Sequence, residues 1–247
     1  MDRSIRTYDD VMALLDTLVG PEADRSTPAA ADWWDAFYQD RDAPVPFFAA
    51  KPDRSLADHA AAGLLAPGRA LDLGCGPGRN ALYLASLGYD TDAVDLSREA
   101  LAWAEERGRG AGAAVRFHHG DAFTLTRPGG PLQGPYDLVH DSGCFHHLPP
   151  HRRVGYLALL DRVLAPGGLF SLSCFAAGGM GWEVDDADVY RGGAPRGGLA
   201  YTAESLRHVF GDLTEVDLRR MSQEPPASPY FGEPFLWTAL FRRPPAP

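Results

Sequence analysis

A short apolar run that breaks into three closely spaced glycines constrains this chain more than any other feature. The stretch LDLGCGPGRNALYLA, residues 71–85, carries one acid, Asp72, then Gly74, Gly76 and Gly78, and resumes with apolar residues at helical spacing. This order predicts a strand, a tight turn and a helix. Glycine permits positive φ and close backbone approach to a ligand, and a helix N-terminus offers unpaired N–H groups. We therefore expect the stretch to bind a nucleotide-like cofactor.

Composition sets the class of protein. A chain of 247 residues with 45% hydrophobic and 23% charged residues is typical of one α/β domain with additions. The net charge of −10 argues against a nucleic-acid partner, which needs a basic face. No run of 18 apolar residues occurs, and residues 1–10 lack the apolar core of a signal peptide, so no membrane partner is expected. Three widely separated cysteines fit the cytoplasm.

Strand patterns alternate with helical ones along the chain. Helical spacing marks 8–19, 56–64, 97–108, 154–164 and 202–210, and strand patterns mark 89–95, 115–119, 136–141, 169–175, 213–221 and 235–241. Strands separated by helices of ten or more residues predict a parallel sheet covered on both faces. The two strands nearest the C-terminus follow each other without a helix, which favours an antiparallel finish.

Four acids fall at the ends of successive predicted strands. They are Asp72, Asp95, Asp121 and Asp141, and Asp95 lies 23 residues after Asp72. Ligands of open α/β sheets bind beyond the carboxyl ends of the strands, and an acid at about this distance reaches a ribose hydroxyl in a nucleotide site. The alternative for each single acid is helix capping or loop solvation.

The glycine spacing narrows the choice of cofactor. A nicotinamide-dependent oxidoreductase needs G-x-G-x-x-G, whereas this turn has G-x-G-x-G. Residues 68–175 resemble the class I S-adenosylmethionine-dependent methyltransferases, through DLGCGPG, VDLS, HGDAF, YDLVHDSGCFHHL and VLAPGG. The resemblance implies a Rossmann-like, seven-stranded, mostly parallel sheet with helices on both faces and one antiparallel strand near the C-terminus. It implies S-adenosyl-L-methionine as cofactor.

The same resemblance implies roles for the residues that match its motifs. The glycine turn would face the methionine part, Asp72 would orient the turn or meet the amino group, and Asp95 would accept from the ribose hydroxyls. Asp121 would accept from the adenine amino group beside the Ala122 N–H, and Asp141 would lie below the sulfonium or hold the amino group. The expected cofactor-binding set is Asp72, Gly74, Cys75, Gly76, Gly78, Asn80, Asp95, Leu96, Asp121, Ala122 and Asp141.

Two adjacent histidines follow the fourth-strand motif, where methyl acceptors bind in the resembled family. His146 or His147 is a candidate general base or positioning residue for a hydroxyl, amine or thiol. The alternative is that one caps the next helix or hydrogen-bonds backbone while the other faces solvent. Cys144 beside them superficially resembles a metal cluster, but the tight spacing and the lack of a partner group predict no metal.

Aromatic residues are dense between 33 and 48, in WWDAFYQDRDAPVPFF. A helix anchored on the core would explain them, and so would a cover over cofactor and substrate. The segment resembles the N-terminal lid of small-molecule methyltransferases such as the thiopurine, thiol/halide and tellurite-resistance enzymes. Expected substrate and lid residues are Trp33, Trp34, Tyr38, Phe47, Phe48, Trp182 and Tyr190.

We therefore predict one methyltransferase domain over 1–247. It comprises an N-terminal helical lid (1–66), a cofactor-binding core (67–175) and two substrate-covering loops (176–200 and 222–235). The predicted function is methyl transfer to an O, N or S atom of a small molecule by in-line displacement. The alternative is a regulatory or cyclase-like protein that binds the cofactor without methyl transfer, because fold does not fix function.

Overall fold

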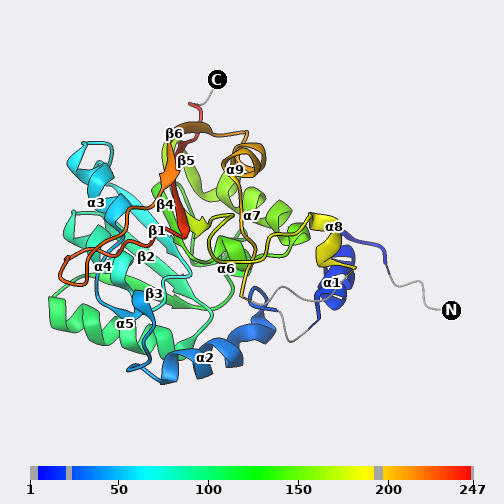
Figure 1. The fold of residues 1–247 in the computed structure, drawn as a ribbon, viewed down its shortest axis with the longest axis horizontal. Coiled ribbons are helices and arrows are strands. Elements are labelled where there is room, and N and C mark those ends of the chain that lie inside the picture. The colour runs from blue at the N-terminus through cyan, green and yellow to red at the C-terminus, as the bar shows by residue number, and fades with distance from the viewer. Residues whose placement is uncertain (1–4, 21–23, 192–196, 246–247) are drawn as a thin grey trace.

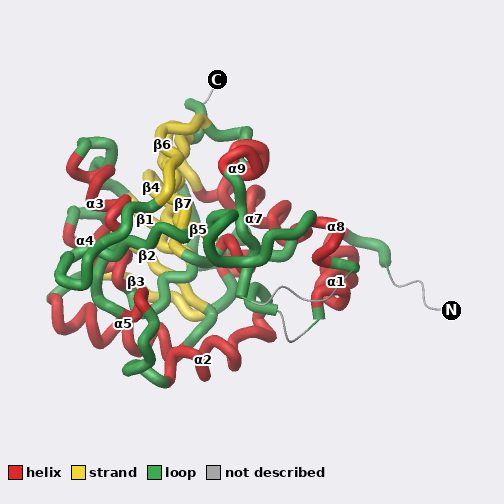
Figure 2. Tube along the Cα trace, viewed as in Figure 1, coloured by secondary structure: helices red, strands yellow, loops and turns green. Residues whose placement is uncertain are grey.

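The computed structural model describes residues 5–20, 24–191 and 197–245. A seven-stranded sheet runs through its centre in the order β3-β2-β1-β4-β5-β7-β6 (Figures 1 and 2). The strands are β1 (Arg69–Leu73), β2 (Asp90–Asp95), β3 (Val115–His119), β4 (Tyr136–Ser142), β5 (Leu164–Phe175), β6 (Thr214–Arg220) and β7 (Leu236–Arg242). Neighbouring strands from β3 to β5 pair in parallel. The strand β7 is antiparallel to both β5 and β6. The predicted fold class, with one antiparallel strand near the C-terminus, is confirmed.

Helices cover both faces of the sheet. In Figure 1, α3 (Arg54–Ala61), α4 (Arg79–Ser86) and α5 (Arg98–Ala111) lie on one side, and α6 (Ala122–Leu125), α7 (Pro150–Val163) and α9 (Ala203–Val209) lie on the other. The remaining helices are α1 (Tyr8–Val19), α2 (Ala31–Gln39), α8 (Asp186–Val189) and three short 3-10 helices, η1 (Pro28–Ala30), η2 (Pro46–Phe48) and η3 (Phe145–His147).

Local sequence signals explain where several helices begin. Thr7 and Thr202 each form a capping box, and the Ser97 side chain accepts a hydrogen bond from the Ala100 N–H at the start of α5. The strand β5 begins at Leu164, five residues before the predicted start at 169, because the sequence Ala-Pro-Gly-Gly at 165–168 continues the strand through an irregular register with β4.

The order of the strands reverses between β1 and β4. From β1 the sheet runs to β2 and β3 in one direction, and from β4 to β5 in the other. Such a reversal opens a crevice at the carboxyl ends of the strands, where ligands of α/β sheets bind. Within the described residues, no helix is long and apolar enough to cross a membrane.

Candidate active site

A pocket of about 420 Å³ opens at the carboxyl ends of β1, β2 and β4. This volume lies in the usual range of small-molecule sites. Most of the residues singled out from the sequence line it: Trp33, Trp34, Tyr38, Phe47, Asp72, Gly74, Cys75, Gly76, Asn80, Asp95, Leu96, Asp121, Ala122, His146 and His147. The fold therefore brings together the glycine turn, the strand ends and the N-terminal aromatic segment.

The glycine turn is closely surrounded. Gly74 has φ +63°, and a Cβ placed on it would lie 2.8 Å from the Cβ of Cys144. A Cβ on Gly76, at φ +52°, would lie 3.0 Å from the hydroxyl of Tyr38. Only glycine allows both this backbone conformation and this approach. The loop after β4 and the N-terminal segment thus close directly onto the turn.

Asp95 uses its carboxylate to hold the turn. It accepts hydrogen bonds from the backbone N–H groups of Gly76 and Ser97, each at 2.8 Å. Burial nevertheless raises the pKa of this carboxyl above its ordinary value. Asp95 lines the pocket, so it presents acceptor oxygens in a fixed position to a ligand on the β2 side.

Asp72 is a buried acid with an unused acceptor. Its side chain is 2% exposed, and Oδ2 has no hydrogen-bond partner among the described residues. Burial raises the pKa of the carboxyl well above its ordinary value. Because an unpaired buried acceptor is costly, a wall carboxyl of this kind suits a ligand that brings its own N–H donor.

Asp121 begins helix α6. Its carboxylate accepts hydrogen bonds from the Phe123 N–H at 3.0 Å and from the Thr124 hydroxyl at 2.9 Å. In this structure the Asp121 side chain therefore caps helix α6, as the alternative interpretation of the sequence expects. The residue and the following Ala122 still line the pocket on the β3 side.

Two residues of the expected cofactor set lie outside the pocket lining. The Asp141 carboxylate accepts from the N–H groups of Cys144 and Phe145 at 2.9 and 3.2 Å and from the Tyr156 hydroxyl at 2.6 Å. It shapes the loop that carries the two histidines, and its expected contact with the cofactor stays a prediction. Gly78 is the N-cap of α4, where a Cβ would lie 2.9 Å from the Cβ of Ala104.

Both histidines are kept neutral. Burial holds the pKa of His146 well below its ordinary value. Burial, followed by the positive charge of Arg25, lowers the pKa of His147 to about 3. The His147 ring packs edge-on against Trp34 with centroids 5.1 Å apart, and its Nδ1 is buried without a hydrogen-bond partner among the described residues.

The aromatic cover differs in part from the expectation. Phe48 is buried, edge-on to Trp103 with centroids 5.2 Å apart. Trp182 packs against the large hydrophobic cluster that contains Phe145 and Tyr201. The Tyr190 hydroxyl lies 2.9 Å from Nδ1 of His151. These three residues do not line the pocket, because they pack against other elements of the fold.

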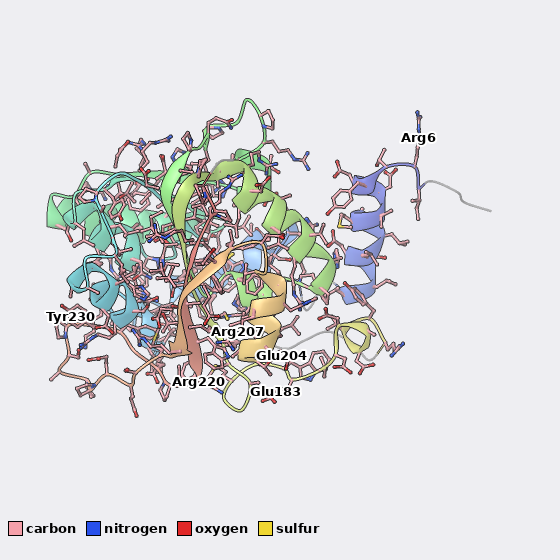
Figure 3. The ribbon with its side chains drawn as sticks, turned by 90° about the horizontal axis from the view of Figure 1, so that it is seen from above. Arg6, Glu183, Glu204, Arg207, Arg220 and Tyr230 are labelled. Atoms are coloured by element: carbon pink, nitrogen blue, oxygen red, sulfur yellow. The ribbon has the colours of Figure 1, made fainter. Side chains whose placement is uncertain are left out.

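Other residues of the predicted covering loops take part instead. Met180 and Gly197 from the first loop and Phe231 and Phe235 from the second line the pocket. Residues 192–196 of the first loop fall outside the described part of the chain. Tyr230, next to Phe231, lies at the end of the molecule opposite α1 (Figure 3).

The core of the chain matches a known family. Residues 70–168 match the model of a family described as methyltransferase domain. Residues 70–168 form a methyltransferase domain. This match confirms the resemblance to class I methyltransferases drawn from the glycine turn and the strand-end motifs, and it spans β1, the switch point and α7.

Relatives and solved structures agree with the domain. The chain is 37% identical to an uncharacterized methyltransferase of Schizosaccharomyces pombe over 93 residues, which are 38% of this chain and 61% of the relative. The chain thus spans less than two thirds of the length of that curated relative. A structure reported with the conversion of a disulfide bond into a thioacetal group during echinomycin biosynthesis has a TM-score of 0.66 and 27% identity, covering 87% of this chain and 92% of that one.

A second solved structure covers almost the whole chain. It is the 1,6-didemethyltoxoflavin-N1-methyltransferase of Burkholderia thailandensis with bound 1,6-didemethyltoxoflavin and S-adenosylhomocysteine. It aligns with a TM-score of 0.56 and 24% identity over 99% of this chain and 93% of that chain. At this identity the similarity shows that the two proteins share a fold.

The sequence did not point to a buried polar cluster beside the methyltransferase glycine turn. Arg79 donates to the Asp53 carboxylate and to the Ser142 hydroxyl, and the Ser173 hydroxyl donates to Asp53 at 3.0 Å. Arg79, Ser142 and Ser173 line the pocket. Only the position of Arg79, directly after Gly78, could have indicated this cluster from the sequence. Asp53 lies 26 residues away from Arg79 and belongs to no recognisable motif.

Across 5–20, 24–191 and 197–245, no group of three or more His, Cys, Asp or Glu side chains could hold a metal ion. Cys144 is a free thiol, and burial raises the pKa of that thiol well above its ordinary value. The neutral thiol is a poor metal ligand, since metals bind the thiolate.

Proposed function

We propose that this chain is an S-adenosyl-L-methionine-dependent methyltransferase that acts on a small molecule enclosed in the pocket. The observation that carries the proposal is the pairing of the glycine turn with two wall carboxylates, Asp72 and Asp95, inside a methyltransferase domain. Relatives named as methyltransferases and a neighbour bound to S-adenosylhomocysteine support it.

The chain's own residues fit this cofactor. Asp72 Oδ2 lacks a partner among the described residues, and it would accept from the amino group of the methionine part. Asp95 would accept from the ribose hydroxyls while keeping its bonds to Gly76 and Ser97. Asp121 and Ala122 would meet the adenine edge. The backbone at Gly74 and Gly76 is bare enough for close contact with a ligand.

When bound, S-adenosyl-L-methionine supplies an activated methyl group on a sulfonium. The protein contributes orientation, since in-line displacement needs the acceptor atom held about 3–3.5 Å from the methyl carbon. Trp34, Phe47 and Phe231 would enclose a largely apolar acceptor and exclude water. His146 and His147 stand at the acceptor side. Both are neutral, so neither repels the positive charge of the cofactor.

The domain limits and the compartment belong to the same proposal. We propose a single domain over 1–247 in which 1–66, 176–200 and 222–235 cover a cofactor-binding core at 67–175. The contribution of Phe47, Met180 and Phe235 to one pocket supports this division. The three free cysteines fit a cytoplasmic protein.

Calorimetry tests the proposal. Wild-type protein titrated with S-adenosylhomocysteine should bind with 1:1 stoichiometry, and Asp95→Ala should bind more weakly because a buried acceptor of the ribose hydroxyls is lost. The exposed Glu215→Ala serves as control and should bind like wild type. Folded wild-type protein that fails to bind S-adenosylhomocysteine or S-adenosylmethionine at millimolar concentration would overturn the proposal.

A further inference from the structure

The imidazole ring of His146 is fixed by its neighbours. Its Nδ1 accepts a hydrogen bond from the Phe175 backbone N–H at 3.3 Å. The ring stacks on the Phe175 ring with centroids 3.7 Å apart and an interplanar angle of 9°. On one edge, a Cβ on Gly198 would lie 2.8 Å from Cδ2 of His146. The ring is therefore held between the end of β5 and the glycines before Leu199.

This hydrogen bond sets the tautomer of the ring. A neutral imidazole has one N–H donor and one lone pair. Because Nδ1 accepts from a backbone N–H, the proton lies on Nε2. Burial, with the neighbouring His147, holds the pKa of His146 well below its ordinary value, so the doubly protonated form does not compete.

The donor nitrogen is left for a ligand. Nε2 has no hydrogen-bond partner among the described residues. The atom is also not fully buried, so a ligand can reach it. His146 lines the pocket together with Gly143 and Gly197. A Cβ on Gly143 would lie 3.7 Å from Cε1, the atom next to Nε2, so the approach to Nε2 from this side is bordered by bare backbone.

We propose that His146 is a fixed hydrogen-bond donor that positions the methyl acceptor molecule, and that it is not the general base of the reaction. A base needs a free lone pair, and in His146 the backbone occupies the lone pair while the other nitrogen is already protonated. The inference rests on the proposed function and refines the role of one of its residues.

The same geometry assigns a class of acceptor molecule. The molecule carries a lone pair on a carbonyl oxygen or an aromatic ring nitrogen, which receives the Nε2–H of His146. Its body is flat and apolar, because Trp34, Phe47 and Phe231 line the pocket.

Nuclear magnetic resonance tests the tautomer without any activity. Protein labelled with ¹⁵N at histidine, with and without S-adenosylhomocysteine, is followed by long-range ¹H–¹⁵N correlation between pH 8 and pH 5. Signals are assigned by their loss in His146→Gln and in His147→Gln. We expect the pattern of a neutral Nε2–H ring for His146 at every pH. An Nδ1–H pattern, or titration of His146 in this range, would overturn the proposal.

A ligand pair tests the donor role. Quinoline and naphthalene have nearly the same shape, but only quinoline has a ring-nitrogen lone pair. Equilibrium dialysis against the S-adenosylhomocysteine complex measures the ratio of their affinities. We expect His146→Leu to lower the quinoline-to-naphthalene ratio by about tenfold. His146→Gln should largely restore it, because its amide accepts from Phe175 and donates to the ligand. An equal ratio in wild type and His146→Leu would refute the role.

The two failures are distinguishable. If the proposed function is wrong, S-adenosylhomocysteine does not bind to the wild-type protein, while the tautomer of His146 is still read from the ligand-free spectra. If only the present inference is wrong, the cofactor product binds normally and the quinoline preference does not depend on His146.

Discussion

Arg79 and Asp53 form an ion pair in which the side chains are only 7% and 0% exposed. Arg79 follows the glycine turn, and Asp53 is the N-cap residue of α3. The Lys51 carbonyl also accepts from Arg79 at 3.1 Å. The guanidinium lies over the ring of Phe231, 4.4 Å from its centroid. This pair therefore fastens residues 51–53 and the loop at Phe231 to the start of α4.

We expect Asp53→Ala to lower the free energy of unfolding by about 3–5 kcal/mol, because it leaves a buried guanidinium without its counter-charge. Urea denaturation measures the change. The matched control is Arg207→Gln, which breaks an exposed pair with Glu215 and should cost no more than about 1 kcal/mol. Equal effects of the two substitutions would contradict the prediction.

Gly74→Ala should destabilise the protein more than Gly112→Ala does. Both glycines have φ +63°, so an alanine at either position adopts a left-handed backbone conformation. An added Cβ meets Cys144 at 2.8 Å in the first case and nothing within 4 Å in the second. We expect an excess cost of about 1–3 kcal/mol for Gly74→Ala, from overpacking, in thermal or urea unfolding. If both substitutions lower the free energy of unfolding equally, the loop after β4 can move away from the added Cβ at no cost, which contradicts the prediction.

Asp72→Asn separates binding from stability. The substitution removes a buried carboxyl whose Oδ2 lacks a partner in the described structure. The unfolding free energy of the ligand-free protein should therefore stay the same or rise. Affinity for S-adenosylmethionine should fall about tenfold or more, because a charge-assisted hydrogen bond is lost. A large loss of ligand-free stability would mean that both oxygens are already satisfied.

Asp141 predicts a direction for the pH dependence of stability. Burial raises the pKa of its carboxyl from 3.8 to about 6 in the folded protein. The folded state thus holds this proton more tightly than the unfolded state, so its contribution to stability is lost as pH rises from about 4 to about 6. Asp141→Asn should flatten the stability–pH curve in this window, measured by urea titrations at several pH values. An unchanged slope would refute the assignment.

The sequence was most informative where function depends on neighbours along the chain. The glycine turn and the strand-end acids are local patterns, so the sheet, the switch point and most of the pocket lining could be predicted. Asp141 could not be placed, because an acid at a strand end can face the ligand or the following loop. Its choice depends on the hydroxyl of Tyr156, which α7 brings from 15 residues away.

Long-range partners also explain the remaining differences. From the sequence alone, Trp182 and Tyr190 are expected at the pocket, because aromatic residues in a glycine-rich loop suit a cover. Packing decides otherwise, since the Tyr190 hydroxyl is engaged by His151 and Trp182 by the main core. Asp53 was missed because its ion pair with Arg79 joins residues whose spacing matches no motif.

The position of β7 has a consequence for how the sheet assembles. β7 lies between β5 and β6, although β6 precedes it in the chain. β6 therefore has no strand to pair with until β7 has been synthesised and has joined β5. During synthesis on the ribosome, strands β1 to β5 can pair with one another as they emerge. In contrast, β6 stays unpaired until β7 has been made. Such an unpaired edge can pair with other chains, so molecular chaperones would matter most in that interval.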